Sequence, residues 1–258
     1  MLTAKQMATA AALLTLIGYA RADWNVGDPY KYVQLPDSQG WDVSPHDPQD
    51  GTFTALADDW VCSETGPVTD IHIWYSWTND VVHPFDFEVS IYSDVPAGTE
   101  PGSFSHPGDM LWGGLFFQNQ FPRFWTRPYT NGNQGWYVPG GTWVQNDHTN
   151  MYQLNVTNIA NPFIQQAGMT YWLVVEMTGT NSDSIGWKTS LTQNNDSAVW
   201  LNTSNRANMK WEKVLDPETS APLDLAFVIT TIPEPATAPL LVLGALALIV
   251  RRRRTLHR

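Results

Sequence analysis

Apolar and polar residues alternate with a period of two along much of the chain, and clusters of Gly, Pro, Asn and Asp separate the alternating segments. Successive side chains of a strand point to opposite faces, so this pattern is typical of half-buried β-strands. It predicts strands over residues 32–35, 70–77, 86–93, 110–117, 152–156, 169–177, 198–201 and 223–229. The chain therefore predicts an all-β fold, an antiparallel β-sandwich with jelly-roll-like topology.

Three segments do not follow the strand pattern. Residues 36–52 carry three prolines and four aspartates, which predicts a long loop. Residues 117–141 are rich in Pro, Gly, Asn and aromatic residues, which predicts an irregular excursion over one sheet face. Residues 158–166 could hold one helical turn before Gly168. There is no internal repeat, and one domain is the expected organisation.

The N-terminus has the features of a cleaved signal peptide. Lys5 provides a positive charge, residues 8–17 form an apolar stretch, and Ala20 and Ala22 flank Arg21 as an A-x-A site. We expect cleavage between Ala22 and Asp23, because the apolar stretch is too short for a permanent anchor.

The C-terminus carries a tripeptide, an apolar segment and a basic cluster in that order. Pro233, Glu234 and Pro235 precede the uncharged residues 236–250, which the four arginines Arg251, Arg252, Arg253 and Arg254 follow. The apolar segment predicts a single transmembrane helix, and the arginines would hold its end in the cytoplasm. A simple C-terminal anchor would look the same without the tripeptide.

This arrangement resembles the PEP-CTERM sorting signal of bacterial exosortase substrates. The resemblance implies export, anchoring in the inner membrane, processing by an exosortase-type enzyme, and release to the cell surface or extracellular matrix, with exopolysaccharide as a candidate partner. One departure is that residues 227–230 read as strand almost up to Pro233, which leaves little room for the usual polar linker.

The three segments are therefore a signal peptide (1–22), a β-sandwich ectodomain (23–231) and a sorting and anchor segment (232–258). The ectodomain keeps all 13 tryptophans, and seven basic residues face 24 acidic ones. This acidity argues against nucleic acid as a partner, whereas the aromatic and aliphatic content is enough to form a core.

The ectodomain also resembles an uncharacterised β-rich ectodomain found on many such sorted bacterial proteins. The matching stretches are residues 56–62, 65–72, 186–190 and 224–229. No activity is assigned to that family, so this resemblance implies none.

Aromatic side chains near amides and carboxylates suggest contact with glycans, because sugars stack on Trp and their hydroxyls pair with polar groups. Trp74 and Trp172 are the candidate contacts, since each lies on the face of its strand opposite the main apolar row. The segment around Asn133, Gln134 and Trp143 has the same aromatic and amide composition. The alternative is that these tryptophans fill the core.

No catalytic residue is assigned, and the chain is not expected to be an enzyme, since it lacks the G-x-S-x-G, H-E-x-x-H and P-loop motifs. The alternative is a carbohydrate-active hydrolase using Glu88 and Glu176, if the fold places two carboxylates about 5–9 Å apart. No metal ligands or cofactor are assigned either. A structural calcium ion could use oxygens of Asp58, Asp59, Asp147 or residues 194–196.

Overall fold

A computed structural model describes the chain over six ranges, residues 23–45, 55–99, 103–116, 124–179, 185–202 and 209–231. These ranges consist of strands and turns, with η1 (Thr78–Asp80), a short 3-10 helix, as their one helical element. The all-β prediction is confirmed. None of the described helices is long and apolar enough to cross a bilayer. The predicted signal peptide and the sorting segment lie outside the described residues.

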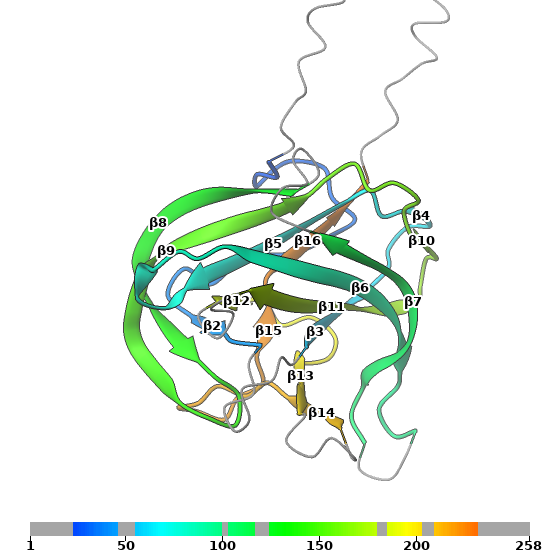
Figure 1. The fold of residues 1–258 in the computed structure, drawn as a ribbon. Coiled ribbons are helices and arrows are strands. Elements are labelled where there is room, and N and C mark those ends of the chain that lie inside the picture. Colours follow the sequence, from blue (N-terminus) through cyan, green and yellow to red (C-terminus); the bar gives the residue numbers. More distant parts are fainter. Residues whose placement is uncertain are drawn as a thin grey trace, which may run out of the picture.

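The larger of two main sheets has eight described strands. In spatial order they are β1 (Tyr32–Gln34), β16 (Phe227–Thr230), β5 (Asp70–Trp77), β9 (Trp143–Val156), β8 (Phe124–Tyr137), β2 (Trp41–Val43), β12 (Ile185–Ser190) and β15 (Asp224–Leu225). Its ladders are antiparallel apart from the parallel pair β2–β8. The long β8–β9 hairpin curves around one side of the molecule (Figure 1).

Part of this sheet closes on itself. The first half of β5 pairs with β16, whereas its end pairs with β12, where Trp77 lies opposite Ile185. Strands β5, β9, β8, β2 and β12 thus form a closed ring of strands. Closure gives an enclosed interior in which side chains from strands that are not neighbours can meet.

The second main sheet has six described strands, and all of its ladders are antiparallel. They are β14 (Lys210–Lys213), β13 (Val199–Asn202), β3 (Leu56–Val61), β11 (Thr170–Gly179), β6 (Phe85–Val95) and β7 (His106–Phe116). A separate two-stranded ladder joins β4 (Gly66–Pro67) to β10 (Ile164–Gln165).

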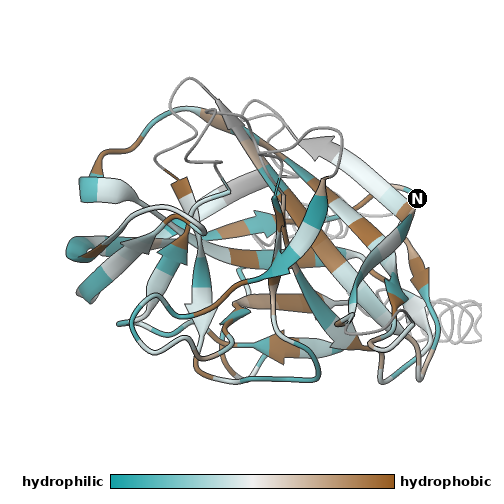
Figure 2. Cartoon of the chain, turned by 90° about the horizontal axis from the view of Figure 1, so that it is seen from below, coloured by the Kyte–Doolittle hydropathy of each residue, from teal (hydrophilic) through white to brown (hydrophobic). Residues whose placement is uncertain are grey.

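Both main sheets contribute alternate residues to one shared core. The larger sheet provides Ile71, Ile73, Trp187 and Phe227, and the smaller provides Leu56, Val89, Ile91 and Leu173. Figure 2 shows the corresponding alternation of hydrophobic and hydrophilic bands along the strands. Burial of this apolar surface from both sides is the main stabilising term of the fold.

Two smaller apolar clusters lie on the other faces of the sheets. Trp74 packs edge to face against Trp24, with ring centroids 6.1 Å apart. On the second sheet, Trp172 packs with Ala57 and Val199, and its indole N–H donates to Asp94 at 2.9 Å. These clusters show that both outer faces are partly covered by other segments of the chain.

The predicted strands correspond to observed ones, but the three other segments need correction. The predicted loop 36–52 contains β2, and the predicted excursion 117–141 contains all of β8. No helical turn forms over residues 158–166, where β10 lies instead. Alternation failed for β2 and β8 because their polar residues face the interior of the ring, where Asp42 and Gln134 are buried.

Candidate ligand groove

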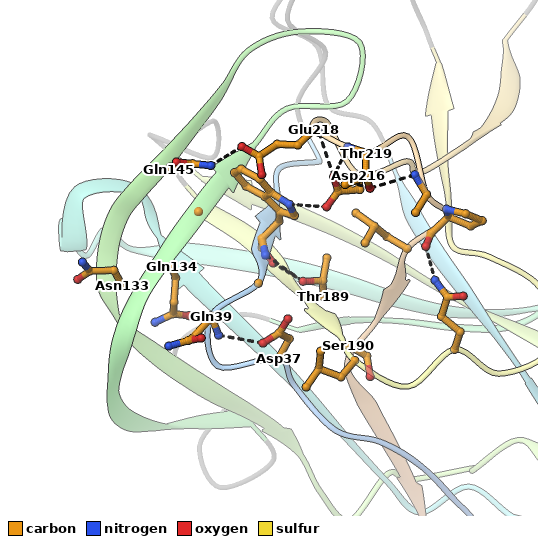
Figure 3. A pocket seen from close by; sticks show the side chains of 18 of the residues that line it. Asp37, Gln39, Asn133, Gln134, Gln145, Thr189, Ser190, Asp216, Glu218 and Thr219 are labelled. Atoms are coloured by element: carbon orange, nitrogen blue, oxygen red, sulfur yellow. Dashed lines mark hydrogen bonds between the residues drawn. The ribbon is translucent and has the colours of Figure 1, made fainter.

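A polar groove with a volume of about 450 Å³ is lined by the start of β2, the second half of β8 and the end of β12. Its lining is rich in amides and carboxylates: Gln39, Asn133, Gln134, Gln145, Asn146 and Gln193, with Asp37, Asp216 and Glu218. Figure 3 shows the side chain of Gln145 directed toward Glu218, and that of Gln39 beside Asp37. None of the described lining residues is Lys, Arg or His, so the groove presents hydrogen-bonding groups and negative charge.

Trp41 is the aromatic residue that lines the groove. Its backbone N–H donates to the hydroxyl of Thr189 at 3.0 Å, and its indole N–H donates to Asp216 at 2.9 Å. The ring packs over Gly135, where an added Cβ would lie 2.3 Å from it, so a glycine is required there. Trp143, which is 43% exposed, packs edge to face against Trp41 with centroids 5.7 Å apart.

Asp216 organises one wall of the groove. Its carboxylate accepts hydrogen bonds from the backbone N–H groups of Glu218 and Thr219. Burial alone would raise the pKa of Asp216, but the N–H of Thr219 and the indole of Trp41 lower it below its usual value. Asp216 is therefore ionised, and it fixes both the turn and the indole ring.

Gln134 lines the groove and is fully buried. Neither its amide oxygen nor its amide nitrogen has a hydrogen-bond partner within the chain. Buried amides normally satisfy these atoms, so the residue has unused hydrogen-bonding capacity next to a polar cavity.

A buried charged cluster lies beneath the groove, inside the ring of strands. His148 on β9 lies opposite Gln134, and its Nε2 is 2.8 Å from Asp42 Oδ2 on β2. Lys188 Nζ on β12 lies 2.8 Å from the same oxygen and donates to the carbonyl of Gly40 at 2.8 Å. Since β8 separates β9 from β2 in the sheet, the contact between His148 and Asp42 crosses the interior of the ring.

A second polar cluster joins Asp58 and Asp59 on β3 to Asp224 and residues 194–196. Asp59 accepts from the side chain of Asn195, and Asp224 accepts from the backbone N–H of Asn194 at 2.7 Å. Burial is the main cause that raises the pKa of Asp58 well above its usual range, that of Asp59 to about 7 and that of Asp224 to about 6.

The fold thus brings together two of the segments predicted as calcium ligands, but not Asp147. Asp147 lies beside the charged cluster under the groove, 3.0 Å from His148 Nδ1. Within the described part of the chain, no group of three or more His, Cys, Asp or Glu side chains is arranged to hold a metal ion. The structural calcium ion stays a prediction.

Glu88 and Glu176 prove to be neighbours. They lie directly opposite each other on β6 and β11, which places their Cα atoms about 4.5–5.5 Å apart. Burial and the charge of Glu88 raise the pKa of Glu176. Neither residue lines the groove or the cavities near Trp74 and near Phe163.

The two tryptophans predicted as glycan contacts are both buried. Trp74 is 3% exposed and Trp172 is fully buried, so neither presents a stacking face. Their assignment to the faces opposite the main core was correct, but Trp24 covers the first and the neighbours on β3 and β13 cover the second. The predicted sites at Ala20, Ala22, Pro233, Glu234, Pro235 and Arg251, Arg252, Arg253, Arg254 lie outside the described residues.

Asn133 and Gln134, which the sequence marked by their aromatic and amide surroundings, do lie in the groove. Asp42, His148 and Lys188 were not assigned a role from the sequence. Their only signal was Lys188 within the matching stretch 186–190, because residues 42, 148 and 188 meet only after the ring of strands closes.

These observations define an all-β protein with a polar groove at the end of a ring of strands. The chain belongs to the family described as a domain of unknown function, DUF7901, whose model matches residues 30–230. This agrees with the expected uncharacterised β-rich ectodomain. No match was found among curated proteins.

Proposed function

We propose that this protein is an exported bacterial envelope protein whose ectodomain contacts glycans through the groove lined by Trp41. The groove is the observation that carries the glycan proposal. Six amides and three carboxylates around a cavity of about 450 Å³ can donate to and accept from many hydroxyls. This volume lies in the range of small-ligand sites, roughly 300–1,000 Å³.

The groove replaces Trp74 and Trp172 as the proposed contact region. Trp41 lines it but is itself buried, with 8% of its surface exposed. The apolar surface open to a ligand is therefore mainly that of Trp143, which is 43% exposed and packs against Trp41. Gln134 adds two unpartnered amide atoms that a hydroxyl could satisfy after a small side-chain movement. The carboxylates in the lining favour neutral glycans over uronic-acid polymers.

Export and sorting form the other part of the proposal. The signal peptide and the PEP-CTERM-like segment support secretion, membrane attachment through the C-terminal segment, processing by an exosortase-type enzyme, and release to the surface or the extracellular matrix.

We also assign the fold as a β-sandwich, since the two main sheets share one core; the jelly-roll-like topology stays a prediction.

A glycan array with purified residues 23–231 tests the glycan proposal. We expect binding to neutral oligosaccharides that Gln39→Ala and Trp143→Ala weaken, while the melting temperature falls by no more than about 4 °C. Gln166→Ala is the matched control, because Gln166 is also an exposed glutamine but lies outside the groove. Absence of binding to every neutral glycan, or equal loss with the control, would exclude the groove as a glycan site.

A hydrolase is the second candidate, and the pairing of Glu88 with Glu176 is the observation that favours it. Two adjacent carboxyl groups, one with a raised pKa, can act as acid and nucleophile in glycoside hydrolysis. The test is release of reducing ends from neutral polysaccharides, which Glu176→Gln should abolish. Activity that survives in Glu176→Gln, or none in the wild type, would reject this candidate.

A further inference from the structure

The charged cluster inside the ring of strands holds an amine against a carboxyl group. Lys188 Nζ lies 2.8 Å from Asp42 Oδ2, and both side chains are fully buried. The two residues are register partners on β12 and β2, so the backbone ladder fixes this contact. Gly186 allows the approach, because a Cβ there would lie 3.0 Å from the backbone of Asp42.

If Lys188 and Asp42 form only an ion pair, one carboxylate oxygen of Asp42 lacks a hydrogen-bond partner. Asp42 Oδ2 accepts from both Lys188 and His148, whereas Asp42 Oδ1 is buried and has no hydrogen-bond partner. An ionised carboxylate with one oxygen in a dry, unpartnered position is unfavourable. Burying the ammonium and carboxylate charges adds a desolvation cost.

We propose that Lys188 and Asp42 condense into an intramolecular amide, an isopeptide cross-link between β12 and β2. The new bond joins Nζ to the carboxyl carbon of Asp42, and the bond from that carbon to Oδ1 breaks, so that Oδ1 leaves as water. The remaining carbonyl oxygen, Oδ2, keeps the hydrogen bond from His148. The amide N–H keeps the carbonyl of Gly40 as its acceptor.

Condensation therefore removes the one oxygen of Asp42 that has no partner and retains the two hydrogen bonds that the product needs. It also replaces two buried charges by a neutral amide, while the ion pair of His148 with Asp147 is kept. The cross-linked state thus leaves no side-chain polar atom of Asp42, Lys188 or His148 without a partner, which distinguishes it from an ordinary buried salt bridge.

The reaction balances without any further reagent. The ammonium of Lys188 first passes a proton to the carboxylate of Asp42, which it contacts directly. The free amine then attacks the carboxyl carbon, and a second proton moves from Nζ to Oδ1, which departs as water. Because the pairing of β12 with β2 already holds the amine against the carboxyl group, the reaction avoids most of the entropy cost of bringing two free groups together.

His148 stabilises the charge that develops during attack. Its Nε2 faces Oδ2, the oxygen that becomes an oxyanion in the tetrahedral intermediate. Burial alone would lower the pKa of His148, but its hydrogen bonds to Asp42 and Asp147 raise it, so Nε2 carries a proton. His148 thus acts as the oxyanion donor of the condensation.

The cross-link joins residues 146 positions apart in a chain whose single cysteine, Cys62, cannot form an intrachain disulfide. A covalent link across so long a loop restricts the unfolded chain as a disulfide would. It would also lock the closure of the ring beneath the groove. This inference is independent of the glycan proposal.

Peptide mapping of the full-length chain, purified in detergent and denatured, tests the proposal. We expect trypsin not to cleave after Lys188, since its amine is blocked. A chymotryptic digest should give a branched peptide containing residues 42 and 188, lighter by one water molecule than the two linear peptides together. Cleavage after Lys188 and two linear peptides of unmodified mass would overturn the proposal and leave an ordinary salt bridge.

Three variants sharpen the result. Lys188→Arg keeps the positive charge but should give only linear peptides, and a branched peptide that persists in it would contradict the assignment. Asp42→Asn should give the same branched product, now by loss of ammonia. In protein freshly made by cell-free synthesis, His148→Leu should form the cross-link at least about tenfold more slowly than the wild type. An unchanged rate in His148→Leu would refute the role of His148.

Discussion

Replacing Trp172 by alanine separates a structural tryptophan from a ligand-binding one. Trp172 is fully buried between Ala57, Val174 and Val199, and its indole N–H donates to Asp94. Truncation of such a side chain costs about 3–5 kcal/mol, since it removes apolar burial and leaves a cavity. Asp94 still accepts from Ser105 at 2.6 Å, so the loss of the indole hydrogen bond adds little.

The assay is equilibrium unfolding in urea, followed by tryptophan fluorescence. With a slope of about 2 kcal/mol per molar, the expected loss of 3–5 kcal/mol lowers the midpoint by roughly 1.5–2.5 M. Trp143→Ala is the matched control. Its ring is 43% exposed and its main contact is the edge-to-face packing on Trp41, so we expect a loss of about 1 kcal/mol.

The two variants should differ in opposite directions in stability and in glycan binding. Trp172→Ala should destabilise without changing glycan affinity in the folded fraction, whereas Trp143→Ala should weaken binding with little effect on the midpoint. The burial argument is refuted if Trp172→Ala shifts the midpoint no more than Trp143→Ala, or if it abolishes binding at wild-type stability.

Three further predictions concern pH, sorting and autonomy of the ectodomain. The raised pKa values of Asp58, Asp59 (about 7) and Asp224 (about 6) mean that the folded state binds more protons than the unfolded chain. Their stabilising contribution is full below about pH 4 and is lost as the pH rises through about 6–7, so the urea midpoint should be lower at about pH 8 than at about pH 5, and Asp59→Asn should flatten this dependence. An equal or higher midpoint at the higher pH would contradict it. Replacing Pro233, Glu234 and Pro235 by alanine should leave an uncleaved, membrane-retained protein; release at the wild-type mass would reject the sorting proposal. Residues 23–231 should fold alone with a β-type circular dichroism spectrum and one cooperative transition, and a mostly helical spectrum would rule this out.

Local pattern identified the strands that have one apolar face. In β5 and β6, alternate residues face the shared core and the others face away from it, so a period of two is visible in the sequence. The same rule missed β12, whose six residues are all buried, and β3, whose aspartates lie in the interior. Runs of adjacent polar residues, Asp58-Asp59 in β3 and residues 188–190 in β12, interrupt the alternation on which such predictions depend, whereas β5 keeps it although both of its faces are buried.

For the candidate site too, the sequence identified some residues correctly and misjudged others. Composition alone marked Asn133 and Gln134 as suited to polar ligands, and they do line the groove. It also favoured Trp74 and Trp172, which other segments of the chain cover. A strand's alternation states which face a side chain occupies, but only the packing of distant segments decides whether solvent reaches that face.

The sequence by itself determined the all-β class, the face that most strand residues occupy and the acidity of residues 23–231, because these follow from short-range periodicity and composition. The tertiary structure alone decided that Asp42, His148 and Lys188 meet, that Glu88 lies opposite Glu176, and that a groove forms above Gln134. These are contacts between residues far apart in sequence. They arise only when strand register and the closure of the ring fix the relative positions of whole strands, and no local pattern encodes that register.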